Sequence, residues 1–379
     1  MAVSYLDHNA TTPVDPRVVA AMLPFLGAEP GNPSSAHRPG RRARAALEQA
    51  REQVAALVGA QPRQVVFTSG GTEANNLALF GLAAAEGHGR IALSPVEHPS
   101  VIEPAQALAG RDWELDWLPV DADGRVDVAA WTPAAETRLV SLMWANNETG
   151  VVQPVAELAA RVRAAGALLH SDAVQALGKL PVDYRAGGVH LLTLSSHKIN
   201  GPQGVGALIV DPAVDLMPRQ RGGGQERGLR SGTENLAGIV GFGRAAELAG
   251  TELAARATAA RALVERLELG LRAIPGVTCF AAGAERLPNT LLFAVDGIDG
   301  EALLLALDRE GVAVSSGSAC HSGTGAPSHV LAAMGVADAL ARGAIRVSVG
   351  QGNDAADIDA LLAALGRQVT ALRRLVASA

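Results

Sequence analysis

The chain has 379 residues, of which 48% are hydrophobic and 18% charged, with a formal net charge of −6 at pH 7. This length and apolar content allow two domains with sizeable cores, and the absence of a long block of like charge argues against nucleic acid as the main partner. Its two cysteines exclude a disulfide framework and a four-thiolate site, and we expect no bound metal.

Residues 1–15 have too little hydrophobic pattern for a domain, and we expect them to form an arm. The first residues lack the basic and apolar regions of a secretory signal. No run in the chain approaches the roughly 18 apolar residues that a membrane span requires. We therefore expect a soluble, cytoplasmic protein that does not contact the membrane.

A strand, a glycine turn and a helix start follow one another near residue 70. A short strand at 64–68 runs into Ser-Gly-Gly-Thr-Glu at 69–73, and a helix begins there. Backbone N–H groups and the positive end of the helix dipole meet at such a point, and glycine lets a phosphate come close. The segment fits neither a Walker loop nor a dinucleotide fingerprint. It predicts a site for a small phosphorylated cofactor, although an ordinary helix cap has the same local sequence.

Strand-like runs then alternate with helical ones. The strand-like runs are 91–93, 139–143, 167–170, 191–195 and 205–210, and residues 155–165 are typical of a helix. This alternation predicts crossover connections and a largely parallel sheet covered on both faces. Ligands of such sheets gather at the carboxyl ends of the strands, where this chain places its polar motifs. These motifs are 97–99, 146–148, 171–175 and 195–198.

The motif at 195–198 contains an unusual lysine. The chain carries 32 lysines and arginines together, but its only lysines are Lys179 and Lys198. A lysine, unlike an arginine, can lose its proton when desolvated and form a Schiff base with a carbonyl. Lys198 stands where a strand meets a glycine-rich turn, which favours a place in a cleft. The plain alternative is a surface lysine in a salt bridge.

The C-terminal part of the chain predicts a second domain. A glycine-rich loop at 219–233 is long enough to be functional. After a helix that bears Leu253 and Leu271, strands at 290–295 and 344–349 and a helix at 301–310 predict a small α+β unit, closed by a helix over 358–375. We therefore expect a large cofactor-binding domain at 16–252 and a small domain formed by 1–15 and 253–379.

Three predicted features together fit pyridoxal phosphate. This cofactor requires a lysine for its aldehyde, an acid for its pyridine nitrogen and a cup for its phosphate. Lys198 is the candidate lysine, and Asp172, which ends the run 167–172, is the candidate acid. Asp172 taken alone is also a good cap for the next helix. His98 could stack on the ring, although a histidine before a proline is often a loop residue.

The two cysteines stand in different surroundings. Cys320 has small, polar neighbours at 315–325, which are typical of an exposed loop in which a thiolate can form and reach a substrate. The alternative is an unreactive loop thiol. Cys279 stands at a strand position among apolar neighbours, and we expect it to be buried and inert.

Several motifs in one order make the chain resemble the cysteine desulfurases over nearly its whole length. The motifs are Tyr-Leu-Asp-His-Asn-Ala-Thr-Thr-Pro at 5–13 and the segments 31–35, 69–73, 146–148, 196–198 and 315–320. These proteins are pyridoxal-phosphate enzymes of the class V aminotransferase family. The resemblance implies an α/β fold, with a fold type I large domain around a mainly parallel sheet and a smaller α+β domain. The segment after Cys320 resembles the long-loop, iron–sulfur and nitrogen-fixation type.

The resemblance implies a role for each matching residue. Around the cofactor ring, Lys198 would be the catalytic Schiff-base lysine, Asp172 the pyridinium partner and His98 the stacking, catalytic histidine, with Asn147 and Gln175 near the ring hydroxyl. The phosphate would be bound by Gly71, Thr72, Ser195 and His197, and by Thr233 from the other subunit of a homodimer.

The resemblance also implies how the substrate is bound and what becomes of its sulfur. Arg346, together with Asn147, would bind the substrate carboxylate through a bidentate fork. The implied reaction converts L-cysteine to L-alanine and leaves a persulfide on catalytic Cys320. The sulfur would pass to an acceptor protein, either an iron–sulfur cluster scaffold or a thiolation enzyme.

Other functions remain open on the sequence. A selenocysteine lyase or another class V enzyme, such as an aminotransferase, is the nearest alternative, and a non-catalytic sulfur carrier is one of another kind. A transaminase has no need of a loop thiol, and a carrier has no need of the cofactor residues. We expect Lys198→Ala to lose the lysine-bound form of the cofactor and turnover, and Lys179→Ala to retain both.

Overall fold

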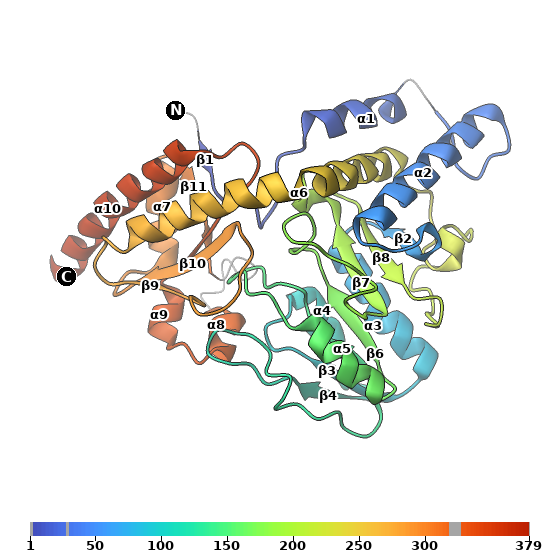
Figure 1. The fold of residues 1–379 in the computed structure, drawn as a ribbon, viewed down its shortest axis with the longest axis horizontal. Coiled ribbons are helices and arrows are strands. Elements are labelled where there is room, and N and C mark those ends of the chain that lie inside the picture. Colours follow the sequence, from blue (N-terminus) through green and yellow to red (C-terminus); the bar gives the residue numbers. More distant parts are fainter. Residues whose placement is uncertain (1–2, 28–29, 318–326, 379) are drawn as a thin grey trace.

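The computed structural model describes residues 3–27, 30–317 and 327–378, which form a seven-stranded and a four-stranded sheet joined by a long helix, together with a two-stranded sheet (Figure 1). The larger sheet has the spatial order β2 (Val65–Thr68), β8 (Gly206–Val210), β7 (Leu191–Ser195), β6 (Leu168–Asp172), β5 (Thr137–Ser141), β3 (Gly89–Leu93) and β4 (Trp113–Trp117). β8 is antiparallel to both of its neighbours, and the pairs from β7 to β4 are parallel. The predicted, mainly parallel sheet is confirmed.

Both faces of this sheet are buried because successive side chains of a strand point to opposite faces. In β8, Ala207 and Ile209 join one apolar cluster, whereas Leu208 and Val210 join another. The first cluster is covered by α1 (Pro16–Leu26), α2 (Arg38–Leu57), α5 (Val155–Ala164) and part of α6 (Leu236–Leu271). The second is covered by α3 (Gly71–Glu86) and α4 (Pro99–Ala109). Because helices cover both faces, polar side chains can meet at the ends of the strands.

The smaller sheet is antiparallel, in the order β12 (Ser315–Ser316), β13 (Ala344–Ser348), β10 (Thr290–Val295) and β9 (Val277–Cys279). α6, α7 (Gly300–Arg309) and α10 (Ala355–Ser378) pack against it around Leu267, Phe293 and Leu365. The short helices α8 (His329–Ala333) and α9 (Asp338–Arg342) follow at its edge. The expected small α+β unit is therefore present.

The N-terminal arm belongs to both parts of the molecule. Its strand β1 (Ser4–Tyr5) pairs in parallel with β11 (Val312–Ala313) of the smaller unit, whereas α1 packs along α6. The helix α6 has 36 residues and runs from one unit to the other, so the division between residues 252 and 253 falls inside a continuous helix (Figure 1). The division into 16–252 and 253–379 with the arm remains a proposal.

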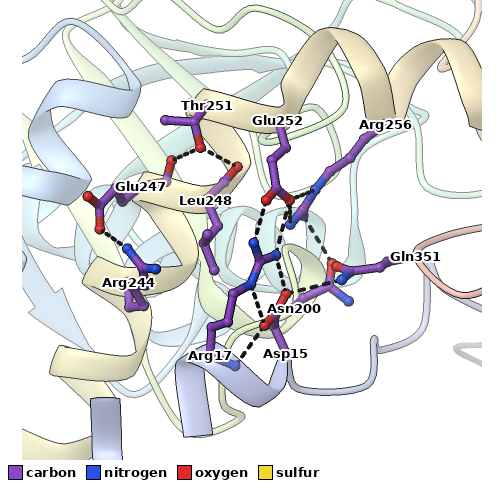
Figure 2. A network of polar contacts seen from close by, with 10 residues as sticks. All are labelled: Asp15, Arg17, Asn200, Arg244, Glu247, Leu248, Thr251, Glu252, Arg256 and Gln351. Carbon is purple, nitrogen blue, oxygen red and sulfur yellow. Dashed lines mark hydrogen bonds and ion pairs between the residues drawn. The ribbon is translucent and has the colours of Figure 1, made fainter. Parts of the chain in front are cut away.

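A polar network fixes the arm where α1 begins (Figure 2). The Asp15 carboxylate caps α1 and binds Arg17, which also binds Glu252 of α6 at 2.6 Å. Gln351, just beyond β13, donates a hydrogen bond to Asp15 at 3.1 Å. Hydrogen bonds from Arg17 hold the pKa of Asp15 below its usual range. The arm segment before Asp15 is thus held between the two sheets.

Several elements were missed by the sequence analysis. The helices α1 and α4 and the edge strand β4 were not predicted, and α6 starts well before Leu253. α1 and α4 each contain a proline, which weakens a helical pattern in the sequence. Of the described helices, none is long and apolar enough to cross a membrane.

Candidate active site

A cavity of about 350 Å³ lies at the carboxyl ends of the parallel strands and is closed by the arm and by β13. Its walls include the predicted site residues apart from Thr233 and Cys320. The lining residues are Asn9, Ala10, Gly71, Thr72, His98, Ser100, Met143, Asn147, Asp172, Val174, Gln175, Ser195, His197, Lys198 and Arg346. Thr233 is exposed and does not line the cavity of its own chain, and Cys320 lies outside the described residues.

One end of the cavity is suited to a phosphate. The 16-residue helix α3 begins at Gly71, so its free N–H groups and dipole are directed to this end. The buried hydroxyl of Ser195 has no hydrogen-bond partner among the described residues. A Cβ atom on Gly71 would lie 2.9 Å from the Val174 side chain, so any larger residue would fill the cradle. The phosphate of pyridoxal phosphate therefore fits these residues.

His197 is placed as a neutral neighbour of this cradle. Its Nδ1 lies 3.1 Å from the Thr11 hydroxyl. Burial, followed by the positive charges of Lys198 and Lys179, lowers the pKa of His197 to about 4. The imidazole is therefore uncharged at neutral pH and can donate a single N–H to a ligand or to Thr11.

Asp172 ends β6 with its carboxylate held on both oxygens. Oδ1 accepts a hydrogen bond from the Val174 backbone at 2.9 Å, and Oδ2 accepts one from Asn75 Nδ2 at 2.7 Å. The hydrogen bond from the Val174 backbone resembles the helix-capping contact that was the alternative role for Asp172. It does not exclude the cofactor role, because the carboxylate also lines the cavity. An oriented carboxylate at this position suits a pyridinium N–H.

Asn75 was missed by the sequence analysis, yet it connects two of the predicted residues. The same amide nitrogen that binds Asp172 also donates to Ser100 Oγ at 2.8 Å. Ser100 in turn lies against His98, with its backbone N–H donating to Nδ1 at 3.1 Å. This contact makes Nδ1 an acceptor, so the proton of the neutral ring resides on Nε2. An asparagine on the otherwise apolar face of α3, beside Ala74 and Leu77, was the signal in the sequence.

Lys198 stands in a 3-10 turn directly after β7. Its Nζ donates hydrogen bonds to the backbone oxygens of Asn9 at 2.5 Å and Ala10 at 2.6 Å. The arm thus positions the amine. From the sequence, residues 5–13 were recognised only as a family motif, and no role was predicted for Asn9.

Arg346 projects into the same cavity from β13 and is only 3% exposed. One terminal nitrogen donates to the Asn147 backbone oxygen at 2.9 Å, and the other binds Asp7 of the arm at 2.7 Å. Its buried Nε has no partner among the described residues. A guanidinium with an unused donor beside a cavity is suited to a carboxylate ligand.

The two ends of the segment that carries Cys320 are described, and both are attached near this cavity. On one side, Ser315 of β12 pairs with Arg346 itself. On the other, Ser328 caps α8 and donates a hydrogen bond to Glu148, the neighbour of Asn147. Cys279 lies in β9 and is partly rather than fully buried, which corrects one expectation, and burial raises the pKa of its thiol.

Comparisons with known proteins agree with this geometry. Residues 4–361 match the family described as Aminotransferase class-V. A cysteine desulfurase of Cereibacter sphaeroides is 48% identical over 377 residues, covering 98% of this chain and 97% of that protein. The solved structure of a NifS-like protein has a TM-score of 0.91 at 37% identity, covering 98% of this chain and 100% of the other.

A third relative was solved with a ligand. The structure described as SspA in complex with cysteine has a TM-score of 0.81 at 31% identity, covering 91% of this chain and 98% of the other. The identities, together with coverage of nearly the full length, exceed what a shared fold alone would require. The chain belongs to the class-V aminotransferase family and, within it, to the cysteine desulfurases.

Proposed function

We propose that the protein is a pyridoxal-phosphate-dependent cysteine desulfurase that moves sulfur from L-cysteine to Cys320 and releases L-alanine. The observation that supports this is a single cavity with a lysine amine, an oriented carboxylate, a phosphate cradle and a buried guanidinium. The ends of the Cys320 segment are attached beside it. The family is generally dependent on this cofactor.

The residues of the cavity suit the parts of the cofactor one by one. Lys198 would bind the aldehyde, Asp172 the pyridine nitrogen, and Gly71, Thr72, Ser195 and His197 the phosphate, with His98 against the ring and Asn147 and Gln175 near its hydroxyl. When bound, pyridoxal phosphate supplies an electron sink for bonds at the substrate α-carbon. Lys198 Nζ, which lines the cavity, would hold and return the proton at the substrate α-carbon.

Arg346, with Asn147 beside it, would orient the substrate through its carboxylate. Cys320 would receive the sulfur, because the described ends of its segment are attached beside the cavity. In the transfer, the Cys320 thiolate forms an S–S bond to the substrate sulfur while the substrate C–S bond breaks. Sulfur is oxidised to the persulfide level, the carbon is reduced to a methyl group, and the protons of the two thiols are conserved between persulfide and alanine. No outside oxidant is needed.

Single-turnover formation of alanine tests the proposal. Cys320→Ser should bind cofactor and L-cysteine but release little alanine, because a serine hydroxyl is a poor nucleophile toward sulfur. Cys279→Ser is the matched control and should react like the wild-type protein. Mass spectrometry of the wild-type protein after one turnover should show one added sulfur on Cys320. Full alanine formation by Cys320→Ser would exclude the mechanism and favour a lyase that needs no protein thiol.

The partners are part of the same proposal. We place Thr233 at the phosphate of a second subunit in a homodimer, since it is exposed and absent from the cavity of its own chain. The persulfide would be passed to an acceptor protein, a cluster scaffold or a thiolation enzyme, in the cytoplasm.

A further inference from the structure

Lys179 is the only lysine of the chain other than Lys198. It lies behind the candidate cofactor cavity, where it lines a second cavity of about 350 Å³. Lys198 lines both cavities, so the second cavity, which Lys179 also lines, is adjacent to the cofactor cavity. From the sequence alone, Lys179→Ala was expected to retain cofactor and turnover, and the contacts of Lys179 lead to a different expectation for cofactor affinity.

The Lys179 amine makes two hydrogen bonds to side chains that line the cofactor cavity. Its Nζ donates to Gln175 Oε1 at 2.7 Å and to Asn9 Oδ1 at 2.9 Å. The Gln175 Nε2 donates in turn to the Asn9 backbone oxygen at 3.0 Å. That same backbone oxygen accepts the Lys198 amine at 2.5 Å. Lys179, Gln175, Asn9 and Lys198 therefore form one connected group.

The direction of these hydrogen bonds decides which way the Gln175 amide faces. The oxygen and nitrogen of a glutamine amide have nearly the same shape, so packing alone does not distinguish them. The Asn9 backbone oxygen can only accept, so it requires the nitrogen at its end, and the Lys179 amine donates to the oxygen at the other end. The nitrogen is then left with one N–H for Asn9 and a second N–H for the cavity.

We infer that Lys179 is a positioning residue of the cofactor site, which together with the Asn9 backbone oxygen holds the Gln175 amide as a hydrogen-bond donor toward the cavity. The inference rests on the proposed function, because a donor at Gln175 suits the ring oxygen of pyridoxal phosphate. Without Lys179, the Gln175 oxygen loses its donor, and the amide is held from one side only, by the Asn9 backbone oxygen.

The surroundings of Lys179 are compatible with this role. Burial, followed by the charges of Lys198 and Arg346, lowers the pKa of Lys179 well below its usual value. An uncharged amine still has two N–H groups, which is the number that Gln175 and Asn9 require. The charged amine can only donate, whereas the uncharged amine also has a lone pair that could accept. Either form can donate to both oxygens, and the Asn9 backbone oxygen requires the Gln175 nitrogen on its own side in both cases.

A double-mutant cycle on cofactor affinity tests the inference. Apoprotein is titrated with pyridoxal phosphate for wild type, Lys179→Met, Gln175→Ala and the double variant, without substrate. We expect each single variant to weaken binding about tenfold, as for one lost hydrogen bond. The double variant should be no weaker than Gln175→Ala alone, because Lys179 acts through Gln175. Lys179→Arg, which keeps N–H donors and has the second cavity for its larger head, should recover part of the loss.

Two controls separate positioning from general stability. Arg161→Met removes a similar side chain whose hydrogen bond goes to the Trp131 backbone, away from the cavity, and should leave cofactor affinity unchanged. If Lys179→Met does not fold, Lys179→Gln takes its place in the cycle. Unchanged affinity, or losses that multiply in the double variant, would overturn the inference. If the wild-type protein forms no alanine, the proposed function is rejected. The double-mutant cycle is still judged on the measured cofactor affinities, which need no substrate.

Discussion

Glu97 is a buried carboxyl group next to His98, and burial determines its protonation state. Its Oε1 accepts a hydrogen bond from the Met143 backbone, and its Oε2 has no partner among the described residues. Burial raises the pKa of Glu97 to about 8, and the negative charge of Asp172 adds to this. Glu97 is therefore a neutral acid at neutral pH, and Asp172 has no second negative charge beside it.

Glu97→Gln should change how stability depends on pH. Between about pH 4.5 and 8 the folded protein keeps the Glu97 proton that the unfolded chain has lost. The folded state binds more protons, so the free energy of unfolding falls as pH rises, by at most about 1.4 kcal/mol per pH unit. Glutamine resembles the neutral acid and cannot ionise. The variant should match the wild type near pH 5 and exceed it by on the order of a few kcal/mol near pH 8.

Urea unfolding at pH 5, 6.5 and 8, at equal cofactor occupancy, measures this difference. The value near pH 5 is the low-pH reference, because the Glu97 side chain is neutral in the folded state there and only the first part of the pH-dependent loss has occurred. A difference between variant and wild type that stays constant with pH would show that Glu97 is ionised in the folded protein.

At the scale of elements, a glycine of α6 lies against the backbone of a neighbouring helix, whereas a glycine of α10 faces open space. A Cβ atom on Gly243 of α6 would lie 2.6 Å from the Ala50 Cα of α2, so the two helices could not stay at their present distance. Gly366 of α10 has no atom within 4 Å of such a position. The first glycine is required for helix packing, whereas the second only weakens its helix.

Alanine substitutions at these two glycines should have opposite effects. Gly243→Ala should lower the free energy of unfolding by about 1–3 kcal/mol through overpacking. Gly366→Ala should raise it by about 0.5–1 kcal/mol, because alanine has the better helix propensity and meets no neighbour. Thermal melting of both variants beside the wild type checks the pair, and a stabilising Gly243→Ala would contradict the close α2–α6 contact.

At the scale of the whole molecule, the site lies where three parts of the chain meet. Asp172 and Lys198 come from the larger sheet, Arg346 from the smaller sheet, and Asn9 from the arm between them. A site built in this way depends on the assembly of the complete fold. The proposed homodimer adds a fourth part, Thr233 of a second subunit.

Mixing of two inactive variants tests whether subunits share the site. Lys198→Ala lacks the amine, and Thr233→Ala should bind the phosphate weakly in the neighbouring site. In a heterodimer, one of the two sites would have both its own lysine and the partner's threonine, so part of the activity should return on mixing. Alanine formation after verified subunit exchange is the measurement. No recovery would indicate that each site is complete within one chain.

Local patterns in the sequence account for the strands and for the polar motifs at their ends. Short continuous runs of apolar residues placed β7 and β10 at their observed bounds, and the polar motifs that follow strands identified Asp172, Asn147 and Lys198. The carboxyl ends of parallel strands meet at one edge, so these motifs could be assigned to one cavity before any tertiary contact was known.

The distant side chains that support these residues could be identified only from the folded chain. Lys179 and Asn9 are 170 residues apart, and Asn75 and Asp172 are 97 apart, yet each pair is hydrogen-bonded. Such contacts arise from packing of the arm and α3 against the sheet, and no periodicity in the sequence encodes them. Local sequence specifies the direction of a side chain along its own element, whereas its partner depends on how the elements are arranged in the whole fold.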